Sequence, residues 1–353
     1  MGHVSYLAEK AGCKTDDLLS GKPFNVHPQV QSDAIRNIDN VLKAEKSEPS
    51  LHSVTYIGEG LCLVRTVWGG HVVVPTFNVD VTIGILRDGI HEAWTTRAVQ
   101  ELLQEGQTYV NVGANFGYYT CLGARIVGHK GTVVSVEANP HVFRVLMKTI
   151  MYAGIVDRVR AYNRAAFIES GKTLDFVFDY QFIGGGHLTG ESEDEGVHSR
   201  DPFWSPVSIP SLLDETGKWV VGRGIMNPFQ VSTLRLDDIT NDLVADLIHC
   251  DVEMAEPYVL LGAVDLLRRS PSCKIIFEWS HQAYDKRGSE YQDAVHKMLE
   301  LFDELGYRIR TILPHVNDDG SINVSGYLSR EEFLSGDHGD YIAIKRSDDP
   351  WTG

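Results

Sequence analysis

The stretch that decides the fold reads Tyr109-Val-Asn-Val-Gly-Ala-Asn-Phe-Gly-Tyr-Tyr-Thr120. Its apolar start predicts a buried strand over 108–112, and Gly113 and Gly117 predict a turn into a helix that runs to about Val127. Glycines at such a turn let a ligand approach the backbone closely. The spacing is neither the G-x-G-x-x-G of a dinucleotide site nor a P-loop, because no Lys-Ser/Thr follows. We therefore expect a ligand that does not need a diphosphate.

The next strand, over 132–136, ends in a carboxylate, Glu137. A carboxylate at this place can accept hydrogen bonds from both hydroxyls of a ribose. Together with the glycine turn it predicts a site for an adenosine-type ligand. A tight turn with a packing role alone is the alternative.

Strands alternate with helices from residue 108 to the C-terminal region. This alternation predicts an α/β fold with a Rossmann-like, doubly wound parallel sheet, for which we expect seven strands. The main expected strands are 108–112, 132–136, 159–163, 245–250, 274–277, 308–313 and 341–345, and the main helices follow at 140–153, 251–268 and 291–305.

The domain from 91 to 353 is preceded by an expected extension over 1–90. A helix that Ser32 could cap is followed there by a β-meander with strands at 53–57, 61–67 and 71–75. An insertion at about 180–230 breaks the alternation and is either disordered or a lid. It contains three glycines (184–186), an acidic run (191–195) and aromatic residues that could line a pocket or form a local core: Trp204, Trp219 and Phe229.

Composition narrows the class of protein. The 353 residues include 32 Lys and Arg against 48 Asp and Glu, a net charge of −16, which argues against a nucleic-acid partner. No apolar run approaches the ~20 residues of a membrane span. The five cysteines form no C-x-x-C pair, as expected for buried thiols in a reducing compartment. We expect a cytoplasmic protein without a membrane partner, and a homo-oligomer is compatible with the sequence.

Several further motifs occur in a definite order along the chain. They are GIHE at 89–92, GTVVSVEANPHVF at 131–143, LRLDDI at 234–239, LIHCDVEMAE at 247–256, LGA at 261–263 and IIFE at 275–278. With the glycine turn they resemble the S-adenosylmethionine-binding core of class I methyltransferases, and specifically the FkbM family with its TLDDL…KIDVEGAE…GA pattern. The resemblance covers roughly residues 89–278.

This resemblance implies an S-adenosylmethionine-dependent O-methyltransferase that releases S-adenosylhomocysteine. The family's acceptors would be hydroxyls of a sugar, polyketide or other small molecule or glycan. Three residues depart from the family pattern: Asn111 stands for Asp, Ala138 for Pro and Met254 for Gly. The implied cofactor-binding residues are Glu92, Asn111, Gly113, Asn115, Thr120, Glu137, Ala138 and Asn139.

A hydroxyl acceptor must lose its proton, so a base near the strand ends would help the transfer. The catalytic candidates are Asp251, Glu253 and His281, and Glu278 and His187 lie in further suitable places. Each has a plainer alternative: the first two could cap the next helix, His281 could be a surface residue, and Glu278 an ion-pair partner.

Metal binding is a separate question. Asp251, Glu253 and Glu256 carry oxygen ligands of the kind that Mg²⁺ and Ca²⁺ prefer. No spacing indicates a metal, and no His/Cys spacing predicts zinc. The sequence therefore assigns no metal-binding residue, although a divalent ion is compatible with it.

Two other functions stay open. A nicotinamide-dependent oxidoreductase would share the sheet and the acidic ribose ligand, but it would need G-x-G-x-x-G. A catalytically degenerate methyltransferase fold could instead serve as a partner subunit, an alternative that the substitutions at Asn111 and Met254 keep open.

Overall fold

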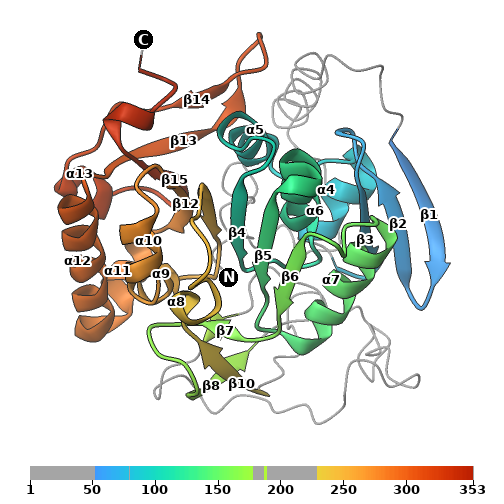
Figure 1. Cartoon of the computed structure of the whole chain (residues 1–353), viewed down its shortest axis with the longest axis horizontal. Coiled ribbons are helices and arrows are strands. Elements are labelled where there is room, and N and C mark those ends of the chain that lie inside the picture. Colours follow the sequence, from blue (N-terminus) through green and yellow to red (C-terminus); the bar gives the residue numbers. More distant parts are fainter. Residues whose placement is uncertain (1–51, 79, 178–186, 189–228, 353) are drawn as a thin grey trace, which may run out of the picture.

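The computed structural model of the chain describes residues 52–78, 80–177, 187–188 and 229–352 (Figure 1). The helix expected after Ser32 lies outside these residues. So do the three glycines at 184–186, the acidic run at 191–195, Trp204 and Trp219.

A central sheet of eight strands organises the molecule, in the order β14-β13-β15-β12-β11-β4-β5-β6. Pairs from β6 to β12 are parallel, and β15, β13 and β14 pair antiparallel. The doubly wound sheet is confirmed, and the short β14 adds an eighth strand to the seven expected. The bounds are β4 (Thr108–Val112), β5 (Thr132–Val136), β6 (Val159–Tyr162), β11 (Leu247–Cys250), β12 (Lys274–Trp279), β13 (Arg308–Val316), β14 (Ile322–Val324) and β15 (Gly339–Ile344).

Helices cover both faces of this sheet (Figure 1). Because side chains alternate along a strand, Tyr109 of β4 belongs to the core on one face and Val110 to the core on the other. The helices of the first core are α5 (Ala93–Leu102), α6 (Tyr118–Val127) and α7 (Pro140–Tyr152). Those of the second are α9 (Glu256–Leu261), α10 (Val264–Arg269) and α12 (Gly288–Leu305).

The expected β-meander forms a separate antiparallel sheet of β1 (Ser53–Gly58), β2 (Leu61–Arg65) and β3 (His71–Pro75). The helix α4 (Val81–Asp88) follows it. The meander packs on α7, where the backbone N–H of Val73 donates to the Thr149 hydroxyl at 3.0 Å. Its apolar residues join the first core, while the boundary between 1–90 and 91–353 stays a prediction.

A second small sheet has the order β7-β10-β8-β9. Its strands are β7 (Ala165–Ala166), β8 (Thr173–Val177), β9 (His187–Leu188) and β10 (Phe229–Leu234), so the insertion leaves from and returns to this sheet. Short helices complete the described chain: α8 (Leu236–Ile239), α11 (His281–Lys286) and α13 (Arg330–Leu334). None of the described helices has the length and apolar character needed to cross a membrane. The described cysteines are buried and unpaired: Cys62, Cys121, Cys250 and Cys273.

Candidate active site

A pocket opens at the carboxyl ends of β4, β5 and β11. The strand order changes direction here, because β5 and β6 follow on one side of β4 and β11 and β12 lie on its other side. This is the place where open α/β sheets bind ligands. The pocket encloses about 620 Å³ including its open mouth. Seven of the residues expected in the site line it: Gly113, Asn115, Glu137, Ala138, Asn139, Asp251 and Glu253.

The glycine turn is shaped by close contact with the neighbouring strand end. Gly113 has a φ of +79°, and a Cβ on it would lie 1.7 Å from the carbonyl oxygen of Asp251. Only glycine fits that space. Asn115 also has a positive φ, 49°, a conformation that asparagine tolerates better than most residues. The turn therefore holds β4 and the end of β11 together at the pocket floor.

Glu137 is fixed at the end of β5 by two backbone donors. One carboxylate oxygen accepts from the Asn115 N–H at 2.9 Å and the other from the Asn139 N–H at 2.8 Å. The residue is only 8% exposed, and burial raises the pKa of Glu137 to about 7, against the effect of these hydrogen bonds. Each oxygen has further acceptor capacity that can face a ligand.

Asn139 begins α7 as its N-cap. Its side-chain oxygen accepts from the N–H groups of His141 and Val142, at 2.9 and 3.4 Å. The preceding backbone carbonyls of Glu137 and Ala138 accept from the Asn163 amide at 2.9 and 3.0 Å. The segment after β5 is thus rigidly held beside the pocket.

Asn111 of β4 and Thr120 of α6 flank the glycine turn in the sequence and are not among the residues that line the pocket. The Asn111 amide donates to the Thr120 hydroxyl at 3.0 Å, and that hydroxyl lies 2.8 Å from the hydroxyl of Ser135. Both expected cofactor residues are almost completely buried. In this arrangement they support the turn.

Glu92, the last residue of the GIHE motif, precedes α5 with a φ of 40°. Its carboxylate accepts a hydrogen bond from the Tyr119 hydroxyl at 2.8 Å. Burial and the nearby Asp340 raise the pKa of Glu92 to about 8. The pKa of Asp251 is also raised to about 8, mainly by burial and further by the charges of Glu92 and Asp340. Glu92 therefore shares an acidic environment with the pocket, although it does not line the pocket itself.

The loop after β11 does not use its acidic residues as helix caps. The helix α9 begins at Glu256, its N-cap is Ala255, and no side chain caps it. Glu256 instead reaches back, and one of its carboxylate oxygens accepts from the Val252 N–H at 2.9 Å. The capping alternative for Asp251 and Glu253 is therefore wrong.

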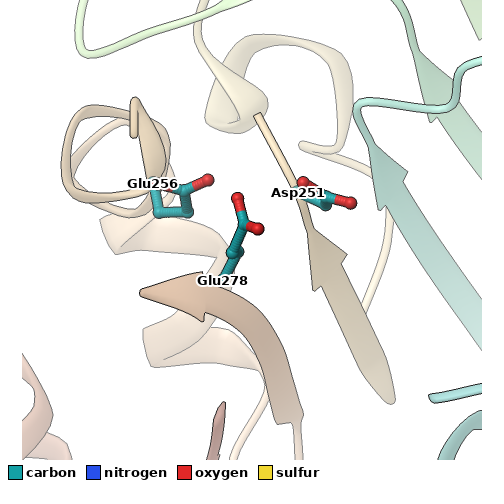
Figure 2. A group of neighbouring side chains, drawn as sticks. All are labelled: Asp251, Glu256 and Glu278. Carbon is teal, nitrogen blue, oxygen red and sulfur yellow. The ribbon is translucent and has the colours of Figure 1, made fainter. Parts of the chain in front are cut away.

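Three carboxylates converge beside this loop (Figure 2). Asp251, Glu256 and Glu278 each place a carboxylate oxygen within 4.8 Å of the other two. Burial raises the pKa of all three groups, that of Glu256 to about 8 and that of Glu278 well above its usual range. The other Glu278 contact is an ion pair with His338 at 3.1 Å. Oxygen donors in this arrangement could hold a divalent ion.

The two histidine candidates lie differently. His281 begins α11, its Nδ1 lies 3.0 Å from the Gly336 carbonyl oxygen, and it is not among the residues that line the pocket. His187 lies in β9, whose backbone pairs with β8 of the small sheet. The geometry brings Asp251 and Glu253 to the pocket and does not bring His281 there.

Sequence reasoning missed several residues of the site. Asp340 is opposite Glu278 across the β12–β15 pair and accepts from Trp94 and Thr95 at 2.9 and 2.6 Å. Arg164 and Phe176 also line the pocket. No local motif marks these residues, because the register of an antiparallel strand remote in sequence cannot be read from its own residues.

Comparison with solved structures gives only distant likenesses. An O-methyltransferase from Bacillus cereus in complex with SAH is 15% identical, with 77% of this chain and 84% of that chain covered and a TM-score of 0.37. The O-methyltransferase TomG from Streptomyces achromogenes, in complex with SAM, is 11% identical, with 75% and 85% covered and a TM-score of 0.38. These values are too low to transfer a substrate.

The sequence itself carries the family assignment. No curated protein matches the chain. The model of the methyltransferase FkbM domain matches residues 111–309, which is more than half of the chain and includes the glycine turn, Glu137 and the carboxylate loop. The chain therefore belongs to the FkbM methyltransferase family.

Proposed function

We propose that this protein is an S-adenosylmethionine-dependent O-methyltransferase that acts on a hydroxyl of a small molecule or glycan. The observation that carries the proposal is the position of Glu137. Its carboxylate is oriented by two backbone N–H groups at the edge of the pocket, within the part of the chain that matches the family. The family assignment covers S-adenosylmethionine-dependent methyl transfer. Transfer to oxygen and the class of acceptor are our proposal, based on the resemblance described above.

The donor set of the pocket suits the adenosine part of the cofactor. Glu137 can accept hydrogen bonds from the two ribose hydroxyls. Apolar side chains also line the pocket, among them Val142, Ala165 and Phe176, as a flat base requires. When bound, the cofactor supplies the activated methyl group.

The residues of this chain would mainly position the two reactants and keep water away. Asp251 and Glu253 line the pocket from the loop after β11. A carboxylate there can accept the proton of an acceptor hydroxyl if the hydroxyl comes within hydrogen-bond distance. We assign this role first to Asp251, whose strand end is fixed against Gly113.

Calorimetric titration with S-adenosylmethionine and with NAD tests the proposal. We expect saturable binding of S-adenosylmethionine alone, and a tenfold to hundredfold weaker affinity in Glu137→Ala, since a charge-assisted pair of hydrogen bonds is worth roughly 1.5–3 kcal/mol. Glu304→Ala, which removes an exposed carboxylate, is the matched control. Preference for NAD would refute the methyltransferase, and an unchanged dissociation constant in Glu137→Ala would refute the ribose assignment.

Turnover is tested separately on a panel of hydroxyl acceptors. Methyl transfer to oxygen, detected as S-adenosylhomocysteine release and product mass, supports the enzyme. Tight cofactor binding without turnover on any acceptor would favour the degenerate partner subunit.

A further inference from the structure

We propose that Asp251, Glu256 and Glu278 form a binding site for a hard divalent cation of the size of Ca²⁺. The site adds a ligand beside the pocket and does not require the proposed function to hold. Its residues come from three places: Asp251 directly follows β11, Glu256 is the first residue of α9, and Glu278 is the last residue but one of β12 (Figure 2).

The spacing of the oxygens fits such an ion. Three atoms that lie within 4.8 Å of one another always leave a point within 4.8/√3, or about 2.8 Å, of all three. Ca²⁺ binds oxygen at about 2.3–2.6 Å and Mg²⁺ at about 2.0–2.1 Å. The carboxylates therefore need to close by at most a few tenths of an ångström around Ca²⁺, and by less than about 1 Å around Mg²⁺.

The second observation is an orphaned acceptor that points into the cluster. Oε2 of Glu278 is buried and has no hydrogen-bond partner, and the Glu278 side chain is 11% exposed. In Figure 2 its carboxylate lies between those of Glu256 and Asp251. A buried carboxylate oxygen without a donor is unfavourable, and a cation between the three groups would satisfy it.

Tyr291 adds a second unsatisfied group in the same region. It is 2% exposed, its hydroxyl has no hydrogen-bond partner, and it lies on α12, which packs against α9. Burial and the nearby Glu256 raise the pKa of Tyr291, and Glu278 adds to the effect. A water molecule on the cation would give this hydroxyl a partner.

Among the described residues, a histidine is the one basic partner of the cluster. Within the described residues no Lys or Arg forms an ion pair with any of the three carboxylates, and the sole ion pair is that of Glu278 with His338. Three carboxylates this close, one of them buried and two partly buried, either hold protons or share a cation. The Val252 N–H donates a hydrogen bond to Glu256 and so holds this carboxylate in position beside the other two.

The cation would lie at the border of the pocket, because Asp251 lines the pocket and also faces the cluster. Ca²⁺ takes six to eight oxygens, so three monodentate carboxylates leave coordination positions for water or for an oxygen of a bound molecule. If the proposed function holds, the acceptor hydroxyl is the oxygen best placed to take one of them.

Calorimetric titration of the full, chelator-treated chain with CaCl₂ tests the site. We expect one equivalent to bind with a dissociation constant below about 1 mM, and at least about tenfold more weakly in Glu278→Gln. Glu304→Gln removes an exposed carboxylate and should bind like the unaltered protein. Absence of saturable binding to the unaltered protein would overturn the proposal.

Two further arms keep the test decisive. Weak, multi-site binding that persists in Glu278→Gln would show nonspecific attraction to an acidic chain of net charge −16 and would also overturn it. If Glu278→Gln does not fold, judged by circular dichroism, Asp251→Asn takes its place with the same expected weakening. Titration with S-adenosylmethionine in chelating buffer reports on the cofactor alone, so a failed cation site and a failed function give different results.

Discussion

At the residue scale, the loops in and near the pocket contain backbone conformations that non-glycine residues rarely adopt. Glu92, Asn115, Glu253 and Met254 all have positive φ, between 40° and 75°. Each such residue costs of order 1–3 kcal/mol and persists only where its surroundings hold it. Met254 stands where the family has glycine, and its φ of 75° explains why glycine is usual there. The strain is concentrated on the loops that carry the carboxylates.

Gly113 offers the sharpest test of this packing. Gly113→Ala should lower the free energy of unfolding by about 3 kcal/mol or more, because its Cβ would lie 1.7 Å from the Asp251 carbonyl oxygen. Gly306, which ends α12, has a similar φ of +82° but nothing within 4 Å of its Cβ position. Gly306→Ala should therefore cost only about 1–2 kcal/mol for its backbone conformation. Equal losses in urea unfolding would contradict the close approach of β4 and β11.

The catalytic candidates differ in position, and this predicts different kinetics. Asp251 lines the pocket, whereas His281 contacts the Gly336 carbonyl outside it. On a confirmed acceptor we expect Asp251→Asn to lower kcat by about 10²–10⁴ with cofactor affinity within about threefold. His281→Ala should keep kcat within about threefold. A large loss of kcat in His281→Ala, without one in Asp251→Asn, would show that the base is His281 of α11.

At the element scale, α7 depends on the cap that also borders the pocket. Asn139→Ala should lower the free energy of unfolding by about 1 kcal/mol, since two N–H groups of the first turn lose their acceptor. Asn139→Asp keeps an acceptor there and should stay within about 0.5 kcal/mol of the unaltered protein at pH 6. Urea unfolding measures both. Full stability of Asn139→Ala would show that water replaces the cap without cost.

The same scale shows what the sequence can and cannot predict. β4 and β5 were predictable to the residue because each is a short apolar run ended by a glycine or a carboxylate. The helix expected over 251–268 is instead two, α9 and α10, separated at Gly262, where a Cβ would lie 2.2 Å from the Phe167 carbonyl oxygen. That contact comes from a segment almost a hundred residues away. Glu137 was predictable from its strand end, while the pairing of Glu278 with Asp340 depends on a register that no local pattern specifies.

At the scale of the whole molecule, the buried acids predict that stability falls as the pH rises. The pKa of Glu137 is raised to about 7 and that of Glu92 to about 8, both from an ordinary 4.5. The folded protein therefore holds protons that the unfolded chain has released. This stabilisation is complete below pH 4.5 and disappears as the pH rises through 7 to 8.

Urea unfolding between pH 5.5 and 8.5 measures this dependence. Each group contributes at most about 1.4 kcal/mol per pH unit in the range between its unfolded and folded pKa. Below pH 7 we expect Glu137→Gln to reduce the slope of the unfolding free energy against pH by the equivalent of about one bound proton. Glu304→Gln should leave this slope unchanged. A slope that stays the same in Glu137→Gln would show that this carboxyl group is ionised in the folded protein.

Ligand binding should show the opposite trend, because the ribose needs the ionised form of Glu137. Methylthioadenosine is a suitable probe, since it has the ribose but no ammonium or carboxylate of its own. Its affinity should rise up to about tenfold from pH 6 to pH 8 and become nearly independent of pH in Glu137→Gln. The two trends arise from one proton: it stabilises the empty fold and must leave before the ribose can be held. An affinity that does not change with pH, beside a stability that does, would mean that Glu137 titrates without contacting the nucleoside.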